Sequence, residues 1–166
     1  MASNQFDILV ETLQENGFIH YELSNFGKEG YFSKNNSSYW LGKKYLGIGP
    51  SAHSYDGEKR GWNIANNSLY LKSLANNELP IEIETLTKTD RYNEYIMTGL
   101  RTIWGVSLER VEQEFGKTYL DYLNRQAAKF IEDHLLFVDD NILRTTKKGK
   151  FLSDGIASDL FLLNLE

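Results

Sequence analysis

The chain has 166 residues, 41% of them hydrophobic and 25% charged, which is enough for the core of one domain or two small ones. Its formal net charge of −5 argues against a general nucleic-acid binder, because phosphate contacts require a basic face. The chain has no cysteine, which excludes disulfides, a thiol nucleophile and a cysteine-ligated metal centre within these residues. It also lacks both an apolar run of about 18 residues and a signal peptide, which favours the cytoplasm.

The first forty residues predict a helix, a strand and a polar loop. Apolar residues at helical spacing predict a helix over residues 5–16, which Gly17 would end. Residues 18–26 alternate between apolar and polar side chains and predict a strand. The polar stretch at residues 33–40 is expected to be a loop that ends in an aromatic pair.

The next stretch predicts a second strand and a short helix. Residues 44–49 have the pattern of a strand whose two glycines mark a close backbone approach or a bulge. A short extended segment is expected at residues 60–64, and leucine spacing predicts a helix over residues 68–76. Pro80 and the extended run after it indicate a boundary between two halves of the chain.

The second half is more regular. Amphipathic spacing predicts a helix that starts near Thr89 or Asp90, a second helix capped by Ser107 and a third over residues 120–131. Residues 135–146 predict two short strands around an Asp-Asp-Asn turn, and a final helix would end the chain. Three helices, a hairpin and a terminal helix are the order of a winged-helix arrangement.

Residues 21–55 carry the most specific pattern in the chain. A short strand, YELSNF, leads to the polar stretch SKNNSSYW, and the glycine-punctuated run YLGIGPSAHS follows. This order resembles the oxygen-independent coproporphyrinogen III oxidase family of radical S-adenosylmethionine (SAM) proteins, and within it the HemW-like haem chaperone branch. The resemblance implies an α+β fold in which residues 1–80 form the carboxy-terminal edge of a radical SAM partial (β/α) barrel. Residues 81–166 would form the family's HemN-type winged-helix-like domain.

The family resemblance also sets an expectation for cofactors. Family members hold a [4Fe–4S] cluster with a Cys-x-x-x-Cys-x-x-Cys motif, and the free iron of the cluster coordinates SAM. Because this chain has no cysteine, the resemblance implies a carboxy-terminal fragment that holds neither group and is inactive alone. The parent protein is expected to bind the cluster, SAM and, in the chaperone branch, haem. The Tyr-Trp motif favours the chaperone branch over the oxidase.

The resemblance further implies a tetrapyrrole site. The family motif His-Asn-x-x-Tyr-Trp is associated with the tetrapyrrole, because aromatic faces stack on a porphyrin and an imidazole can ligate its iron. Asn36, Tyr39 and Trp40 match this motif, whereas Asn35 stands where the family has His and would be a poor axial ligand. His53 is the fifth candidate, since it follows the glycine run on a loop expected to face the cavity. The alternative for a lone histidine is a hydrogen-bonded structural role.

Four residues are candidates for the cavity wall. Glu22 and Asn25 lie in the strand that the resemblance places in the barrel wall, where a carboxylate would bind a polar ligand group. The alternative for Glu22 is a solvated, outward-pointing side chain. Gly47 and Gly49 would belong to the strand that closes the barrel, or to a buried strand of another kind. A phosphate-binding loop is a weaker alternative, since the third glycine of the dinucleotide motif and the Lys-Ser/Thr of a P-loop are absent.

Two other functions remain open on the sequence alone. A free-standing winged-helix module would bind a protein or, through Lys147, Lys148 and Lys150, a phosphate backbone, although a surface charge cluster is the commoner explanation. A structural interaction domain is the third hypothesis, in which apolar surface left by missing barrel strands produces a dimer. On the leading hypothesis the partners are the amino-terminal radical SAM barrel and a tetrapyrrole, either haem or coproporphyrinogen III.

Overall fold

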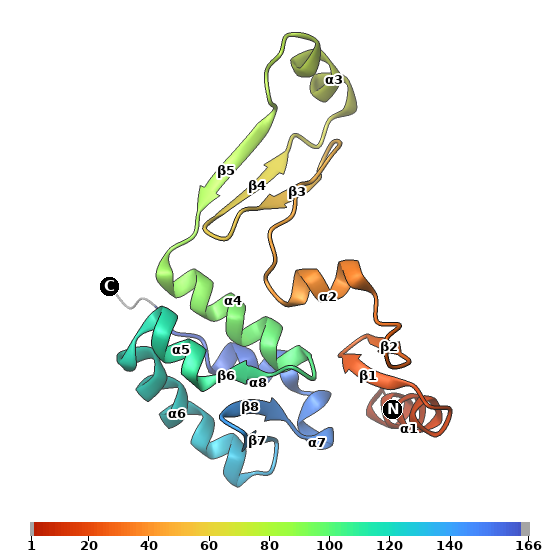
Figure 1. Cartoon of the computed structure of the whole chain (residues 1–166), viewed down its shortest axis with the longest axis vertical. Coiled ribbons are helices and arrows are strands. Elements are labelled where there is room, and N and C mark those ends of the chain that lie inside the picture. The colour runs from red at the N-terminus through yellow and green to blue at the C-terminus, as the bar shows by residue number, and fades with distance from the viewer. Residues whose placement is uncertain (1, 164–166) are drawn as a thin grey trace.

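The structure is a computed structural model, and it describes residues 2–163. It has the mixed α+β fold that was predicted, with helices and three small antiparallel sheets. Figure 1 shows the β3–β4–β5 sheet and α3 projecting away from the helices of the carboxy-terminal half. No helix within residues 2–163 has the length and hydropathy needed to cross a membrane.

The chain begins with a helix and a β-hairpin. Helix α1 (Ala2–Glu15) ends before Gly17, whose φ of 77° suits a helix stop. Strands β1 (Ile19–Glu22) and β2 (Asn25–Gly27) pair antiparallel. The prediction of one strand over residues 18–26 was therefore wrong. The chain reverses after Glu22 because the side chain of that residue accepts a hydrogen bond from the backbone of the turn.

Residues 33–40 are a helix and not the predicted loop. Helix α2 (Lys34–Trp40) starts at Ser33, whose hydroxyl accepts a hydrogen bond from the backbone N–H of Asn36 at 3.3 Å. The polar composition hid this helix, because none of its residues is fully buried and no apolar periodicity marks it. The helix places the aromatic pair at its carboxy-terminal end.

A three-stranded sheet follows, in the order β3-β4-β5. The bounds of this part are β3 (His53–Tyr55), β4 (Lys59–Asn63), α3 (Asn67–Ala75) and β5 (Ile81–Thr85). The predictions for residues 60–64 and 68–76 are confirmed by β4 and α3. The strand predicted at residues 44–49 was wrong, since this stretch has only an isolated bridge from Tyr45 to Tyr55. Because β5 pairs with β4, the sheet extends to residue 85, and the domain division near residue 80 stays a prediction.

The carboxy-terminal half has the element order of a winged helix. Its bounds are α4 (Lys88–Arg101), β6 (Val106–Ser107), α5 (Leu108–Phe115), α6 (Lys117–Glu132), β7 (Leu136–Asp139), β8 (Ile142–Thr145), α7 (Lys147–Lys150) and α8 (Ser153–Asp159). The sheet order is β6-β8-β7. Ser107 caps α5 as predicted, accepting from the backbone N–H of Arg110 at 3.2 Å. The single terminal helix of the prediction is divided into α7 and α8.

The apolar core lies in the carboxy-terminal half. Its buried members come from every helix and strand of that half except α7: Tyr92, Ile96, Leu100, Val106, Val111, Phe115, Leu123, Ala127, Leu136, Leu143, Ile156, Ala157 and Leu160. Burying a side chain of this size contributes roughly 1.5–3 kcal/mol, so this cluster is the main source of stability. The preceding half has Val10 and Tyr21 as its buried apolar residues within the described part of the chain.

Candidate functional site

The carboxylate of Glu22 is fully enclosed, and both of its oxygens accept hydrogen bonds. Its Oε1 atom accepts from Nε and Nη2 of Arg101 at 3.1 and 3.0 Å. Its Oε2 atom accepts from the backbone N–H of Ser24 at 3.0 Å and from the side-chain amide of Asn25. A buried carboxylate is tolerated only where it is paired and hydrogen-bonded, so these donors explain why Glu22 points inward and not into solvent.

Arg101, at the end of α4, connects this carboxylate with two other parts of the molecule. Its Nη1 atom donates to both carboxylate oxygens of Asp154 at 2.7 and 2.8 Å. Its guanidinium lies 5.0 Å from the centre of the Trp40 ring, within the range of a cation–π contact. Its backbone C=O accepts from the N–H of Leu23 at 2.9 Å. One arginine thus links β1, α2 and α8 to α4.

Helix α2 is joined to the same network by Asn36, the second residue of the Asn35–Trp40 motif. The side-chain amide of Asn36 donates to the Oδ1 atom of Asn25 at 3.1 Å, which continues the chain of hydrogen bonds from Glu22. Trp40 lies one helical turn after Asn36, on the same face of α2. Tyr39 likewise lies one helical turn after Asn35, and both are on a neighbouring, exposed face of α2. The network therefore fixes the orientation in which α2 presents its aromatic pair.

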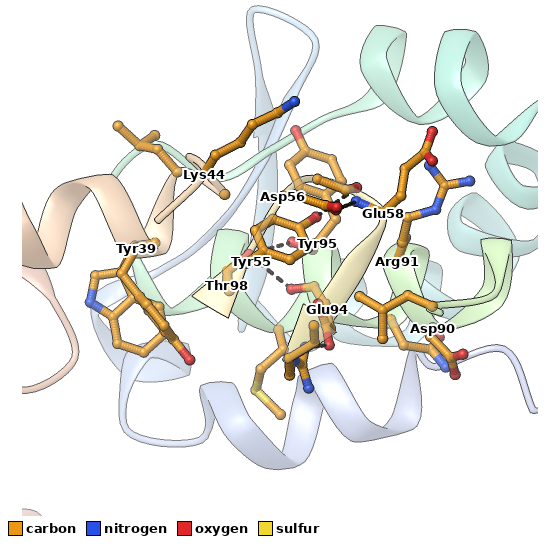
Figure 2. Close-up of a pocket in the computed structure, with 18 of the residues that line it drawn as sticks. Tyr39, Lys44, Tyr55, Asp56, Glu58, Asp90, Arg91, Glu94, Tyr95 and Thr98 are labelled. Atoms are coloured by element: carbon orange, nitrogen blue, oxygen red, sulfur yellow. Dashed lines mark hydrogen bonds and ion pairs between the residues drawn. The ribbon is translucent and has the colours of Figure 1, made fainter. Parts of the chain in front are cut away.

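A cavity of about 1290 Å³ lies between α2, the β3–β4–β5 sheet and α4 (Figure 2). Ligand pockets commonly measure about 300–1,000 Å³, so this one has room for a large ligand. Three predicted site residues line it, namely Tyr39, Trp40 and His53, whereas Asn35, Asn36, Glu22, Asn25, Gly47 and Gly49 do not. The structure therefore separates the predicted residues into three groups. One lines the cavity, a second, made of Glu22, Asn25 and Asn36, forms the supporting network, and Asn35, Gly47 and Gly49 belong to neither.

Aromatic side chains form a connected wall of this cavity. The ring of Tyr39 lies 5.6 Å from that of Trp40 and 5.5 Å from that of Tyr45, and Tyr45 lies 6.1 Å from Tyr55. Burial, together with the neighbouring Tyr39 phenol, raises the pKa of Tyr45 above its ordinary value of 10.0. Tyr45 therefore stays neutral well above pH 7. His53 is exposed on β3 and completes this side.

The two predicted glycines serve the backbone of the loop before β3. A Cβ atom on Gly47 would lie 2.1 Å from the carbonyl oxygen of His53, so no other residue fits there without movement of the chain. The side-chain amide of Asn63 donates to the carbonyl oxygens of Gly49 at 2.8 Å and of Gly47 at 3.4 Å. The expected close backbone approach is thus present, although the segment is a loop and not a strand.

Two of the three lysines considered for phosphate contact are engaged within the chain. Lys147 forms an ion pair with Glu11 at 2.8 Å, and Lys150 is buried near Glu22. Burial lowers the pKa of Lys150 from 10.5 to about 8, and the charge of Glu22 opposes part of this shift. Lys148 is exposed and donates to the backbone carbonyl oxygen of Asp133 at 3.5 Å, so among the described residues it is the one of the three that is neither ion-paired nor buried. The alternative of a nucleic-acid-binding winged helix finds no support.

Sequence reasoning missed the cations of the site. Arg101 is 79 residues from Glu22, and Arg60 on β4 pairs with Glu94 on α4, so no local pattern reveals either contact. The sequence did show the amphipathic spacing of α4. That spacing predicted the helix, but it did not predict which residues contact the polar face of the helix. Within residues 2–163, no group of three or more His, Cys, Asp or Glu side chains could hold a metal ion.

Comparison with known proteins places the chain. Residues 86–152 match the HemN C-terminal domain family. The haem chaperone HemW of Lactococcus lactis is 32% identical over 160 residues, which cover 96% of this chain and 42% of that protein. HemW of Bacillus subtilis is 30% identical, covering 93% of this chain and 41% of that protein.

A solved structure agrees with these relatives. Coproporphyrinogen III oxidase (HemN) from Escherichia coli, a radical SAM enzyme, superposes with a TM-score of 0.70 over 93% of this chain and 40% of that one, at 20% identity. The chain therefore spans about two fifths of the length of the proteins it matches. Together with the HemN C-terminal domain at residues 86–152, these matches show that the chain corresponds to the carboxy-terminal part of HemN/HemW-like radical SAM proteins.

Proposed function

We propose that this chain supplies a haem-binding surface in a HemW-like haem chaperone of the cytoplasm. In this proposal residues 1–80 complete the edge of a radical SAM barrel and residues 81–166 form the domain that closes it. The observation that supports the proposal is the cavity with a continuous wall of Tyr39, Trp40, Tyr45 and Tyr55. The names of the relatives, which are haem chaperones, favour haem over coproporphyrinogen III.

The chemistry of a tetrapyrrole matches this wall. A porphyrin is a large flat apolar ring, and aromatic side chains that stack on such rings contribute roughly 0.5–1.5 kcal/mol each beyond simple burial. His53 lines the same cavity and offers an imidazole as a ligand for iron. Asn35, in the position of the family His, is exposed one helical turn before Tyr39, outside the lining of the cavity.

The residues of this chain do not fit the iron–sulfur cluster of the family. A [4Fe–4S] cluster requires cysteine thiolates, and the chain has no cysteine. We therefore assign no catalytic residue and no step of SAM chemistry to these residues. The cluster and SAM belong, in this proposal, to the radical SAM core that contacts residues 1–80. Exposed apolar side chains such as Leu46 and Ile48, 79% and 85% exposed, would face that core or a second copy of the chain.

Haem titration followed by visible absorption tests the proposal. The wild-type chain is expected to shift the Soret band, and Tyr39→Ala and Trp40→Ala each to weaken binding by about threefold to tenfold, because each removes a stacking face. His53→Ala is expected to alter the position of the band if its imidazole ligates the iron. Asn35→His is expected to leave binding nearly unchanged, because residue 35 lies outside the lining of the cavity.

A matched control separates the site from unspecific adsorption of haem. Tyr31 is 84% exposed and does not line the cavity, so Tyr31→Ala should leave the titration unchanged. Far-UV circular dichroism of each variant verifies that α2 and the sheet are intact. A Soret shift that none of the cavity substitutions alters would place the haem elsewhere and would refute the proposal.

A further inference from the structure

Four cationic side chains line the cavity, and only two of them form an ion pair with a carboxylate in the described part of the chain. Arg60 is paired with Glu94. Arg110 is paired with Glu114 at 2.8 Å and also lies over an aromatic ring. The remaining two, Lys44 on the loop before β3 and Arg91 on α4, line the same cavity and form no ion pair within residues 2–163 (Figure 2).

Arg91 is the more unusual of these two. Its Nε atom is enclosed by the protein, and within residues 2–163 it has no hydrogen-bond partner. An arginine offers five donors, and an enclosed donor without an acceptor costs about 1–3 kcal/mol, more for a charged group. The neighbouring Asp90 does not supply the acceptor, since its Oδ2 atom accepts from the backbone and hydroxyl of Thr87 in the cap of α4. Because Arg91 lines the cavity and no hydrogen bond engages its guanidinium within residues 2–163, its outer nitrogens are the donors that an anionic group in the cavity would meet.

We propose that Arg91 binds a carboxylate of the ligand, with Lys44 taking a second one. This inference rests on the proposed function and deepens it, because haem carries two propionates and coproporphyrinogen III carries four. The same cavity is also lined by Asp56, Glu58 and Glu84, none of which forms an ion pair in the described part of the chain. Two free cations match two propionates, whereas further carboxylates would meet like charge. The cavity therefore selects a dicarboxylic tetrapyrrole.

Iron-free porphyrins test this assignment without iron ligation. We would titrate the chain with protoporphyrin IX, its dimethyl ester and coproporphyrin III, following porphyrin fluorescence. The wild-type chain should bind the diacid about tenfold more tightly than the diester, since a hydrogen bond to a charged group contributes about 1.5–3 kcal/mol. It should also bind the diacid more tightly than the tetraacid.

Substitutions then locate the carboxylate contact. Arg91→Met keeps the apolar stem and should remove most of the diacid-to-diester preference, leaving the smaller part that Lys44 supplies, whereas Arg91→Lys should restore part of the loss. Lys44→Met should reduce the ratio by a smaller factor, because Lys44 is exposed to solvent. Arg125 lies on α6 outside the cavity, so Arg125→Met is the matched control and should leave the ratio unchanged. Thermal unfolding of each variant verifies folding.

The outcomes distinguish a failure of the carboxylate contact from a failure of the proposed haem-binding function. Equal binding of diacid and diester by the wild-type chain would overturn the role of Arg91, even if Arg91→Met did not fold. A wild-type preference that Arg91→Met retains would overturn it as well. In both cases the proposed function stands as long as Trp40→Ala weakens porphyrin binding. If no porphyrin binds, or binding ignores Trp40→Ala, both proposals fail.

Discussion

The carboxy-terminal region (residues 86–163) and the amino-terminal region (residues 2–85) differ in how they use apolar side chains. The first encloses a continuous core in which Ile96, Leu100 and Leu143 are almost completely buried. The second leaves large apolar side chains in solvent, such as Leu46, 79% exposed, and Leu79, 81% exposed. One region therefore contains its own source of stability, whereas the other carries surface suited to a further partner.

The two regions meet at a polar junction. Glu22 of β1 and Arg101 of α4 form a buried ion pair, and backbone hydrogen bonds join Leu23 to Arg101 and Ile103 to Tyr21 beside it. Because the amino-terminal region has few buried apolar contacts, this junction is expected to decide whether α2 keeps its place against the cavity. Substitutions on either side of the junction test that division of roles.

The largest effect is expected from Glu22→Gln. This change keeps the shape of the side chain but leaves the guanidinium of Arg101 facing a neutral amide in an enclosed site. Removing one partner of a buried pair costs about 3–5 kcal/mol, and denaturant unfolding measures it. The matched control is Asp154→Asn, on the other side of Arg101. Because the Asp154 side chain is 54% exposed, its loss should cost about 0–1 kcal/mol. Similar costs for both changes would contradict a buried junction.

A second comparison matches two leucines from the two regions. Leu100→Ala should lower the free energy of unfolding by about 2–5 kcal/mol, since the side chain is fully buried and its loss leaves a cavity. Leu79→Ala should change it by no more than about 0.5 kcal/mol, because the side chain is already in solvent. Urea unfolding of both variants provides the measurement. A large loss at Leu79 would show that the amino-terminal region buries surface in solution.

The third prediction concerns pH and the lysine beneath the junction. Burial lowers the pKa of Lys150 from 10.5 to about 8, so between these values the unfolded chain binds more protons than the folded one. Stability from this group should therefore rise with pH over that window, by about 2–3 kcal/mol. Lys150→Met should remove the rise and stabilise the chain near pH 7, because no ammonium group is then desolvated.

The comparison with the variant isolates Lys150 from other groups that titrate in alkali. Unfolding of wild type and Lys150→Met at pH 7 and pH 10 gives the difference directly. A variant that is less stable at pH 7 would show that attraction between Lys150 and Glu22 outweighs desolvation.

The same contrast explains what the sequence could predict. In the carboxy-terminal region, helices follow from apolar periodicity, and the hairpin follows from Asp140 and Asn141, whose φ values of 48° and 61° suit a two-residue turn. In the amino-terminal region, α2 has no buried residue and hence no periodicity, so its sequence predicts a loop. Apolar periodicity therefore predicts helices and strands where these elements pack against a core, and it fails where they do not.

The candidate site divides in the same way. Tyr39 and Trp40 were predicted from the family motif and His53 from its place after the glycine run. All three line one cavity, although their role in binding stays a prediction. Arg101 was missed because contacts between residues far apart in the chain leave no local signal, and Arg91 was missed because only the folded chain brings α4 to the cavity. Glu22 shows this most clearly, since its burial depends on an arginine 79 residues later.

The smallest expected change in stability comes from removing the amino-terminal cap of a helix, and the caps of α4 and α3 can be compared. Thr87 caps α4 in a reciprocal capping box with Asp90, whereas Asn66 caps α3, a helix without buried residues. Each cap removed by alanine costs its helix about 1 kcal/mol. Because α4 belongs to the core, Thr87→Ala should lower global stability by that amount. Asn66→Ala should instead increase local opening of α3, seen as faster amide hydrogen exchange there with an unchanged unfolding midpoint. If Asn66→Ala lowered the midpoint as much as Thr87→Ala, α3 would have to unfold together with the core, and the two regions would share one cooperative unit.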